Sequence, residues 1–129
     1  MGTAELFSKV TQDYDYLAGV EISQAFIDSA YQLHPHLKTE KVKLINGNAV
    51  HLESILREHY PGSHDFWNPK TLRLTCLCMN TFGILPGEVR KLAIREMFKV
   101  SGPGGRMIIG CWHRDSLRRG YQEFYSRYP

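Results

Sequence analysis

A single carboxylate lies at the joint between two different sequence patterns. In AGVEISQAFIDSA, residues 18–30, an apolar run reaches Glu21, and a helical pattern begins at Gln24 with Ser23 placed as its N-cap. An ionised carboxylate accepts several hydrogen bonds, which suits the two hydroxyl groups of a ribose at the end of a strand. A lone acid in a solvated loop would give the same pattern, so Glu21 by itself leaves both interpretations open.

A second apolar run, at residues 42–45, ends in the turn Asn46-Gly47-Asn48. Asn48 can donate and accept hydrogen bonds at once, as the edge of an adenine ring requires. Its small neighbours, Gly47 and Ala49, leave room for a flat ring. A plain turn is the alternative interpretation of these residues.

Polar and aromatic residues also follow two later apolar runs. Asn80, Thr81 and Phe82 follow the first of these, and Trp112 and His113 follow the second. His113 could serve as a general base or contact a substrate, and Trp112 could form a wall of a substrate pocket. A solvated loop histidine and a tryptophan of the core are the alternatives.

Three cysteines, Cys76, Cys78 and Cys111, all lie inside apolar segments. Cys76 and Cys78 form a Cys-x-Cys pair, but no second pair completes a zinc site, so no metal is predicted. The favoured interpretation is that all three are buried free thiols in a reducing compartment.

The chain as a whole is short and slightly basic. It has 129 residues, 43% of them hydrophobic and 22% charged, with a formal net charge of +3, which indicates one globular domain. The basic residues are scattered, so nucleic acid is not a predicted partner. Because no apolar run approaches about 18 residues and no secretory signal is visible, no membrane partner is predicted and the expected location is the cytoplasm.

Short apolar runs alternate with amphipathic ones along the whole chain. This alternation predicts an α/β fold, a Rossmann-like parallel sheet of about four strands with crossover helices. Ligands of such sheets bind beyond the carboxyl ends of the strands, which is where the polar residues named above fall. The turn at residues 102–105 predicts a positive φ at Gly104 or Gly105. Helices are expected at residues 4–10, 24–33, 51–59, 88–100 and from 115 onward, and strands at 16–22, 42–45, 72–79 and 107–112.

Four segments, taken in order, resemble class I S-adenosylmethionine-dependent methyltransferases of the small-molecule type. GVEIS before a helix resembles the segment with an acid after the family's second strand, and INGNAVHL resembles the segment usually written G-D-A. LTCLCMNTFGILP is similar to the fourth-strand segment. REMFKVSGPGGRMIIGCW strongly resembles the helix, Pro-Gly-Gly turn and fifth strand of many members, and the resemblance extends over roughly residues 2–125.

The resemblance implies S-adenosylmethionine as the cofactor and methyl transfer to a small-molecule acceptor as the activity. It assigns Glu21 to the ribose. The alternative function is a non-catalytic, methyltransferase-like chain that serves as a binding or scaffolding partner. The implied cofactor-binding residues are Gly2, Thr3, Glu21, Ile22, Asn48, Ala49, Asn80 and Thr81, and those implied for the substrate are Phe82, Trp112 and His113.

The chain departs from the family pattern in two ways. Asn48 stands where members usually have an acid. The family's first strand and G-x-G-x-G loop should precede the first helix, yet only Gly2 and Thr3 resemble the end of that loop, and the family's last two strands have no counterpart before Pro129. We therefore expect residues 1–129 to form a single partial methyltransferase domain that is truncated at both ends and binds the cofactor poorly by itself.

The absent first strand would lie between the family's second and fourth strands. Its absence leaves two sheet edges exposed, and exposed edges favour association. Either the two flanking strands pair directly, or another chain fills the gap, or the fold is incomplete. A homo-oligomer or a complementing chain is the partner predicted at these edges.

Overall fold

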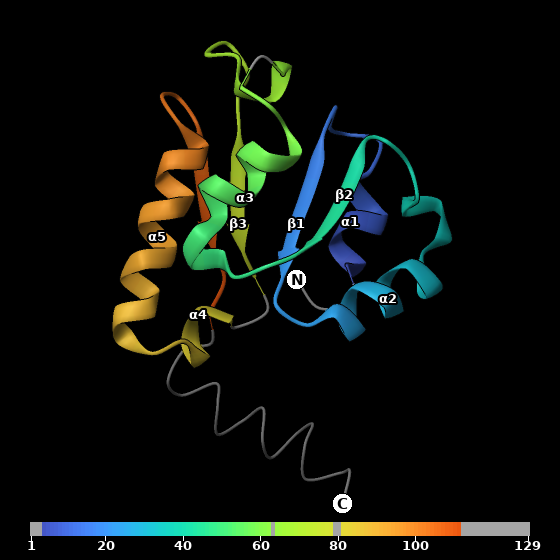
Figure 1. The fold of residues 1–129 in the computed structure, drawn as a ribbon, viewed down its shortest axis with the longest axis horizontal. Helices are drawn as coiled ribbons and strands as arrows, with labels where there is room; N and C mark the ends of the chain where they lie inside the picture. The colour runs from blue at the N-terminus through green and yellow to red at the C-terminus, as the bar shows by residue number, and fades with distance from the viewer. Residues whose placement is uncertain (1–3, 63, 79–80, 112–129) are drawn as a thin grey trace, which may run out of the picture.

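The computed structural model describes residues 4–62, 64–78 and 81–111, which alternate between helices and strands (Figure 1). The helices are α1 (Glu5–Val10), α2 (Gln24–Leu33), α3 (Leu52–His59), α4 (Thr81–Ile84) and α5 (Gly87–Ser101), with 3-10 turns η1 (Pro35–Leu37), η2 (Ala49–His51) and η3 (Asp65–Trp67). The strands are β1 (Leu17–Glu21), β2 (Val42–Asn46), β3 (Leu74–Leu77) and β4 (Arg106–Ile109).

The four described strands form two separate parallel pairs. β1 pairs with β2 in a register that puts Glu21 beside Asn46, and β3 pairs with β4 in a register that puts Leu74 beside Arg106. The strands lie in the order β2, β1, β3, β4 and all run the same way (Figure 1). The predicted α/β class is thus confirmed, but the expected single sheet of four strands is replaced by two two-stranded sheets, because no ladder joins β1 to β3.

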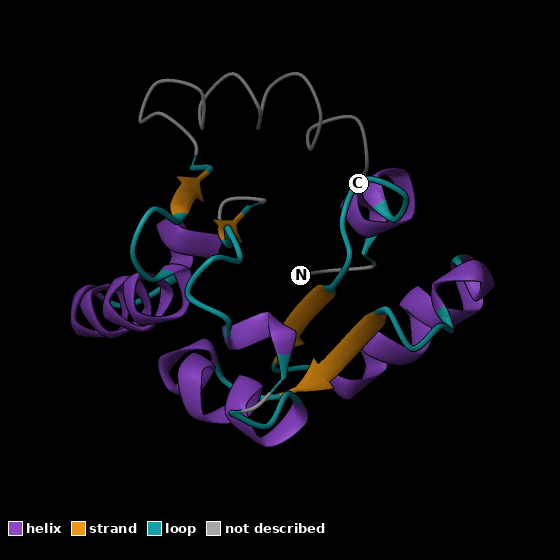
Figure 2. Ribbon diagram, turned by 90° about the horizontal axis from the view of Figure 1, so that it is seen from above, coloured by secondary structure: helices purple, strands orange, loops and turns teal. Residues whose placement is uncertain are grey.

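Helices α1 and α2 pack on one face of the first sheet. The apolar side chains between them form a first core, which excludes water on that face. Viewed along the strands, these helices lie on one side and α3 and α5 on the other (Figure 2). The first core consists of buried Ala4, Leu17, Ala30, Leu37 and Val42, with Phe7, Val10, Tyr31 and Leu44 packed against them.

A second core fills the opposite face of the first sheet and holds α3 and α5 against it. It is richer in aromatic residues, which bury more area per side chain. Its buried members are Ile45, Leu56, Tyr60 and Val100, packed with Tyr16, Ala18, Val20, Leu52, Ile55, Phe66 and Trp67.

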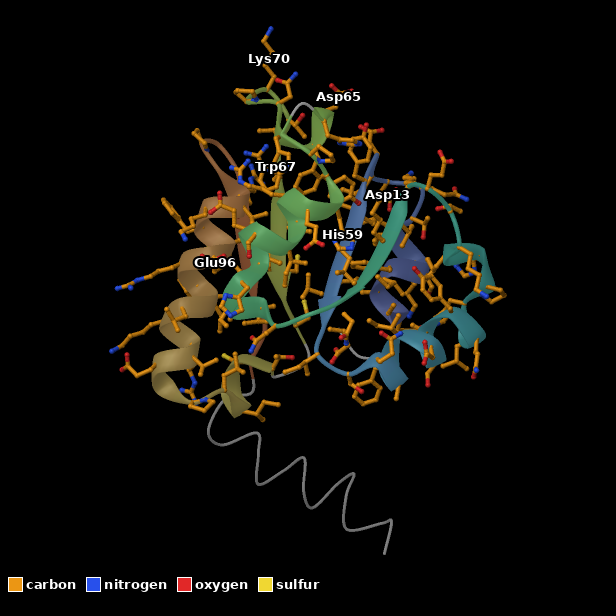
Figure 3. The ribbon with its side chains drawn as sticks, viewed as in Figure 1. Asp13, His59, Asp65, Trp67, Lys70 and Glu96 are labelled. Atoms are coloured by element: carbon orange, nitrogen blue, oxygen red, sulfur yellow. The ribbon has the colours of Figure 1, made fainter. Side chains whose placement is uncertain are left out.

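Glu96 links the two helices of this layer (Figure 3). Its Oε2 accepts a hydrogen bond of 2.9 Å from the backbone N–H of Glu53, in the first turn of α3, and its Oε1 lies 2.6 Å from Nζ of Lys99. Burial alone would raise the pKa of Glu96, but the hydrogen bonds from Lys99 and from the Glu53 backbone outweigh it and lower the pKa below 4.5. The ionised carboxylate therefore stabilises the contact between α3 and α5.

The second sheet is covered by α5 on only one face in the described part of the chain. Thr75 faces α5, where its hydroxyl lies 2.8 Å from that of the buried Ser101. Leu74 and Cys76 point to the other face and are exposed, as is Ile108 beside Cys76. A continuous apolar run such as residues 72–79 predicts a strand covered on both faces, and this prediction is wrong for these residues.

The expectation that the three cysteines are buried is also wrong. Cys76 and Cys111 are exposed and Cys78 is only partly covered, although all three are free thiols as predicted. An apolar run predicts a strand, but it does not show whether each face of that strand receives a helix. The alternation of faces along β3 therefore leaves Cys76 on the side opposite to α5.

The turn between α5 and β4 depends on three glycines. Gly102 and Gly104 have φ of 64° and 75°, so the prediction of a positive φ is confirmed at Gly104. Gly105 has no such φ, but a Cβ on it would lie 2.1 Å from the carbonyl oxygen of Ser101. A side chain at Gly102 would meet the guanidinium of Arg73, whose Nε donates to the carbonyl of Val100. Glycine thus avoids backbone strain at Gly102 and Gly104 and a clash with the backbone at Gly105.

Candidate cofactor site at the strand ends

Glu21 is the last residue of β1, and its side chain is held by the turn that follows. Oε1 accepts a hydrogen bond of 3.0 Å from the backbone N–H of Ser23. Nδ2 of Asn46, at the end of β2, donates to the carbonyls of Glu21 and Ile22 at 3.2 and 3.1 Å. The exposed Ile22 lies in this turn. The geometry fixes a carboxylate at the carboxyl end of a strand, as expected for Glu21.

Sequence reasoning did not assign a role to Asn46. This role could have been predicted, because an amide side chain at the end of a strand can hydrogen-bond to the backbone of the neighbouring turn. Ser23 takes the expected N-cap position of α2, but its hydroxyl makes no capping hydrogen bond. The bonds from Ser23 N–H and from Asn46 thus order the turn between β1 and α2.

The turn after β2 lies beside the turn after β1. The N–H of Gly47 donates to the carbonyl of Glu21 at 3.0 Å. A Cβ on Gly47 would lie 2.6 Å from Cδ1 of Ile55, so the small residue allows the turn to pack on α3. Oδ1 of Asn48 accepts from the N–H of Val50 at 3.1 Å, which starts η2 at Ala49. Asn48 is therefore also part of a local turn, which was the alternative interpretation of these residues from the sequence.

A short helix begins soon after the end of β3. Thr81 and Phe82 lie in α4, a short helix that was not predicted. The hydroxyl of Thr81 donates to the carbonyl of Cys78 at 2.9 Å. Arg90 closes the other end of α4 by donating to the carbonyls of Leu85 and Gly83 at 2.7 and 2.9 Å.

The structure brings one group of the predicted cofactor residues together. Glu21 and Ile22 lie at one strand end, and Asn48 and Ala49 lie at the adjacent one. Thr81 and Phe82 follow β3, whose carboxyl end points the same way in Figure 1. The other predicted residues, Gly2, Thr3, Asn80, Trp112 and His113, lie outside the described residues.

An aromatic cluster occupies the opposite end of the strands. The ring of Tyr60 stacks on Phe66 with centroids 4.6 Å apart, and Phe66 meets the edge of Trp67 at 4.9 Å. The guanidinium of Arg57 lies 4.3 Å from the Trp67 ring, a cation–π contact. Trp67 lies above α3, on the side away from the helix α4 (Figure 3). This cluster stabilises the second core and is remote from Glu21.

Tyr60 carries an unusual buried group. Its side chain is 1% exposed, and its hydroxyl has no hydrogen-bond partner among the described residues. Burial, with a smaller contribution from Tyr16, raises the pKa of Tyr60 to about 12. The neutral phenol is therefore favoured in the folded protein.

Two surface hollows lie near the amino ends of β3 and β4, away from the strand ends that hold Glu21. A hollow of about 530 Å³ is bounded by Phe98, Lys99 and residues 102–105, at the amino end of β4.

Within the described residues, no three His, Cys, Asp or Glu side chains gather closely enough to hold a metal ion. No described helix is both long and apolar enough to cross a membrane.

Comparison of the chain with models of protein families, with curated proteins and with solved structures gives no match.

Proposed function

We propose that this chain binds S-adenosylmethionine beyond the carboxyl ends of its strands and is a methyltransferase domain for a small-molecule acceptor. The observation that carries the proposal is the position of Glu21. It is the last residue of β1, its carboxylate is fixed by Ser23 N–H at 3.0 Å, and the end of β2 lies directly beside it. A carboxylate at this point of a parallel sheet suits the hydroxyl groups of a ribose.

The residues of the neighbouring turn fit the adenosine part of this cofactor. Oδ1 of Asn48 accepts from Val50 N–H, so the donor Nδ2 is the group suited to an acceptor nitrogen of adenine. The exposed side chain of Ile22, 72% accessible, offers an apolar surface for the ring. These residues would bind and orient the cofactor without taking part in a covalent step.

The bound cofactor would supply an activated methyl group on a sulfonium. The protein's task is then to hold an acceptor atom in line with that methyl group, which is a matter of positioning. Phe82 and, outside the described residues, Trp112 and His113 are the residues we propose for the acceptor. His113 is proposed as the base for an acceptor that must lose a proton.

Isothermal calorimetry with S-adenosylmethionine tests the proposal through Glu21→Gln. This variant keeps an oxygen acceptor for Ser23 N–H but loses the charge. Hydrogen bonds to charged groups contribute about 1.5–3 kcal/mol, so we expect the dissociation constant to rise roughly 10- to 150-fold.

Glu88→Gln is the matched control. Glu88 lies in the first turn of α5 with a side chain that is 83% exposed, and it pairs only with Lys91 among the contacts described for it. The Glu88→Gln variant should bind the cofactor with the same dissociation constant as the wild type. If wild type and Glu21→Gln bind equally well, and circular dichroism shows that both are folded, Glu21 is not part of the cofactor site.

A second candidate function is a non-catalytic chain that keeps this fold and acts as a binding or scaffolding partner. The division of the described strands into two separate sheets favours it, because unpaired strand edges recruit other chains. The same calorimetry separates the two candidates. Saturable heat at micromolar cofactor supports the methyltransferase, and no heat from a folded chain supports the scaffold.

A further inference from the structure

Asn46, at the end of β2, holds the turn between β1 and α2 by two successive backbone carbonyls. Its Nδ2 donates to the carbonyl oxygen of Glu21 at 3.2 Å and to that of Ile22 at 3.1 Å. An amide nitrogen carries two hydrogens, so one side chain can satisfy both acceptors. The N–H of Gly47 also donates to the Glu21 carbonyl, at 3.0 Å. The end of β2 thus fixes the direction of both carbonyls.

The carbonyl of Ile22 and the N–H of Ser23 belong to the same peptide group. A trans peptide group is planar, so its C=O and N–H point in opposite directions and can only turn together. The hydrogen bond from Asn46 to the Ile22 carbonyl therefore also fixes the direction of the Ser23 N–H. That N–H donates to Oε1 of Glu21 at 3.0 Å. Through one rigid peptide group, Asn46 thus acts on the carboxylate of Glu21.

We propose that Asn46 is a positioning residue of the cofactor site, which orients the carboxylate of Glu21 for the ribose hydroxyl groups. This inference rests on the proposed function, because Asn46 affects the cofactor only through Glu21. A carboxylate that is ordered before its ligand arrives loses less side-chain entropy on binding, so its hydrogen bonds contribute more to the affinity. Asn46 itself is exposed and belongs to neither core, so its replacement should leave the packing of the fold unchanged.

Amide hydrogen exchange by NMR in the cofactor-free chain tests whether Asn46 orders this turn. Asn46→Ala removes the donor of both bonds, so the peptide group between Ile22 and Ser23 is free to turn. The Ser23 amide should then exchange about fivefold faster or more. The amide of Val50, which donates to Oδ1 of Asn48 in the next turn, should keep its rate. Equal exchange of the Ser23 amide in the wild type and in the variant would overturn the inference.

A double-mutant cycle in calorimetry with S-adenosylmethionine tests whether this order matters for binding. The net contribution of neutral hydrogen bonds corresponds to roughly 3- to 10-fold in an equilibrium constant, and Asn46→Ala should raise the dissociation constant by that factor. In the Glu21→Ala background the same change should have an effect of less than about twofold, because no carboxylate remains to be oriented. A merely structural role of Asn46 would weaken binding by the same factor in both backgrounds, and that result would overturn the inference.

Asn68→Ala is the matched control. Asn68 lies between Trp67 and Lys70, at the end of the strands opposite to Glu21 (Figure 3), and its Oδ1 accepts from the N–H of Lys70 at 2.9 Å in an exposed turn. This variant also loses a turn hydrogen bond, but it should bind the cofactor as the wild type does and keep the exchange rate of the Ser23 amide. A loss of affinity in Asn68→Ala as large as that in Asn46→Ala would overturn the inference.

The two measurements distinguish failure of this inference from failure of the proposed function. A folded wild type that gives no heat with S-adenosylmethionine rejects the cofactor, and with it the role of Asn46 in binding. Saturable binding by the wild type, with an unchanged dissociation constant in folded Asn46→Ala, rejects the role of Asn46 alone. Asn46→Ser, whose shorter side chain cannot reach both carbonyls, should behave like Asn46→Ala and takes its place if the alanine variant does not fold.

Discussion

At the scale of single residues, Tyr60 offers a direct test of the second core. Its hydroxyl is buried without a partner in the described part of the chain. Such a group costs about 1–3 kcal/mol of desolvation, whereas a phenyl ring of the same shape does not. We expect Tyr60→Phe to leave the free energy of unfolding unchanged or to raise it by up to about 1 kcal/mol.

Tyr31→Phe is the matched control, with the opposite expected sign. Its hydroxyl accepts the N–H of Leu44, so the change leaves that donor without its partner and should destabilise the fold by about 1 kcal/mol. Urea denaturation of both variants measures the difference. A Tyr60→Phe variant less stable than Tyr31→Phe would show that the Tyr60 hydroxyl is satisfied.

Tyr60 should also make the free energy of unfolding depend on pH in alkaline solution. The pKa of Tyr60 is raised from 10.0 to about 12 in the folded protein, so its contribution to stability is complete below pH 10 and is lost as the pH rises toward 12. Over that range the wild type should lose up to about 1.4 kcal/mol per pH unit relative to Tyr60→Phe. Parallel stability curves for the two proteins between pH 9 and 11.5 would contradict the raised pKa.

The glycines of the turn before β4 separate two effects of a side chain. Gly104 has φ of 75°, and a Cβ on it would make only an ordinary contact, 3.7 Å from Cδ2 of Leu72, so Gly104→Ala should cost about 1 kcal/mol through backbone strain. Gly105→Ala should cost more, because its Cβ would lie 2.1 Å from a backbone oxygen. Gly62, with no atom near and no positive φ, is the control and should tolerate alanine. Melting temperatures in the order Gly62→Ala, Gly104→Ala, Gly105→Ala, from high to low, are expected.

At the scale of elements, Glu96 holds α5 to α3. Glu96→Ala removes the acceptor of Glu53 N–H and should lower the free energy of unfolding by about 1–2 kcal/mol. Glu88→Ala, which removes an exposed pair with Lys91 on the same helix, should change it by less than about 0.5 kcal/mol. Equal effects of the two changes would mean that Glu96 contributes no more than a surface charge.

The contribution of Glu96 should also depend on pH. Its pKa is lowered in the folded protein, so the stabilisation is present above pH 4.5 and is lost as the pH falls through the folded value. Wild type should therefore lose more stability than Glu96→Ala between pH 5 and 3, as followed by thermal melts.

Most elements could be predicted from the sequence, because periodicity is a local property. The helix at residues 24–33 was predicted with the bounds that α2 has, and strands β1 to β4 all lie within one residue of the predicted ranges or inside them. The short helix α4 was missed, since a four-residue segment with Gly83 and a nearby Pro86 carries no helical period. The position of Glu21 at a strand end was predictable for the same local reason.

At the scale of the whole molecule, the sequence was less informative. The exposure of Cys76 and the separation of β1 from β3 depend on which elements meet, and no local pattern records that. The hydrogen bonds from Asn46 to the turn after β1 likewise join residues that are 24 and 25 positions apart. Contacts of this kind follow from tertiary packing, which overrides any single-residue expectation.

The two cores have a consequence for the cooperativity of unfolding. They lie on opposite faces of the first sheet and share no residue. The buried members of the first core are all aliphatic and include Ala4 and Ala30, whereas the second core contains Tyr60, Phe66 and Trp67. The layer of α1 and α2 should therefore open as a unit at a lower free energy than the layer of α3 and α5. Native-state hydrogen exchange at rising denaturant concentration should show two groups of amides. Their opening free energies should become equal only near the denaturant concentration at which the whole protein unfolds. A single group throughout would mean that the first sheet transmits the loss of one layer directly to the other, so that the molecule melts as one cooperative body.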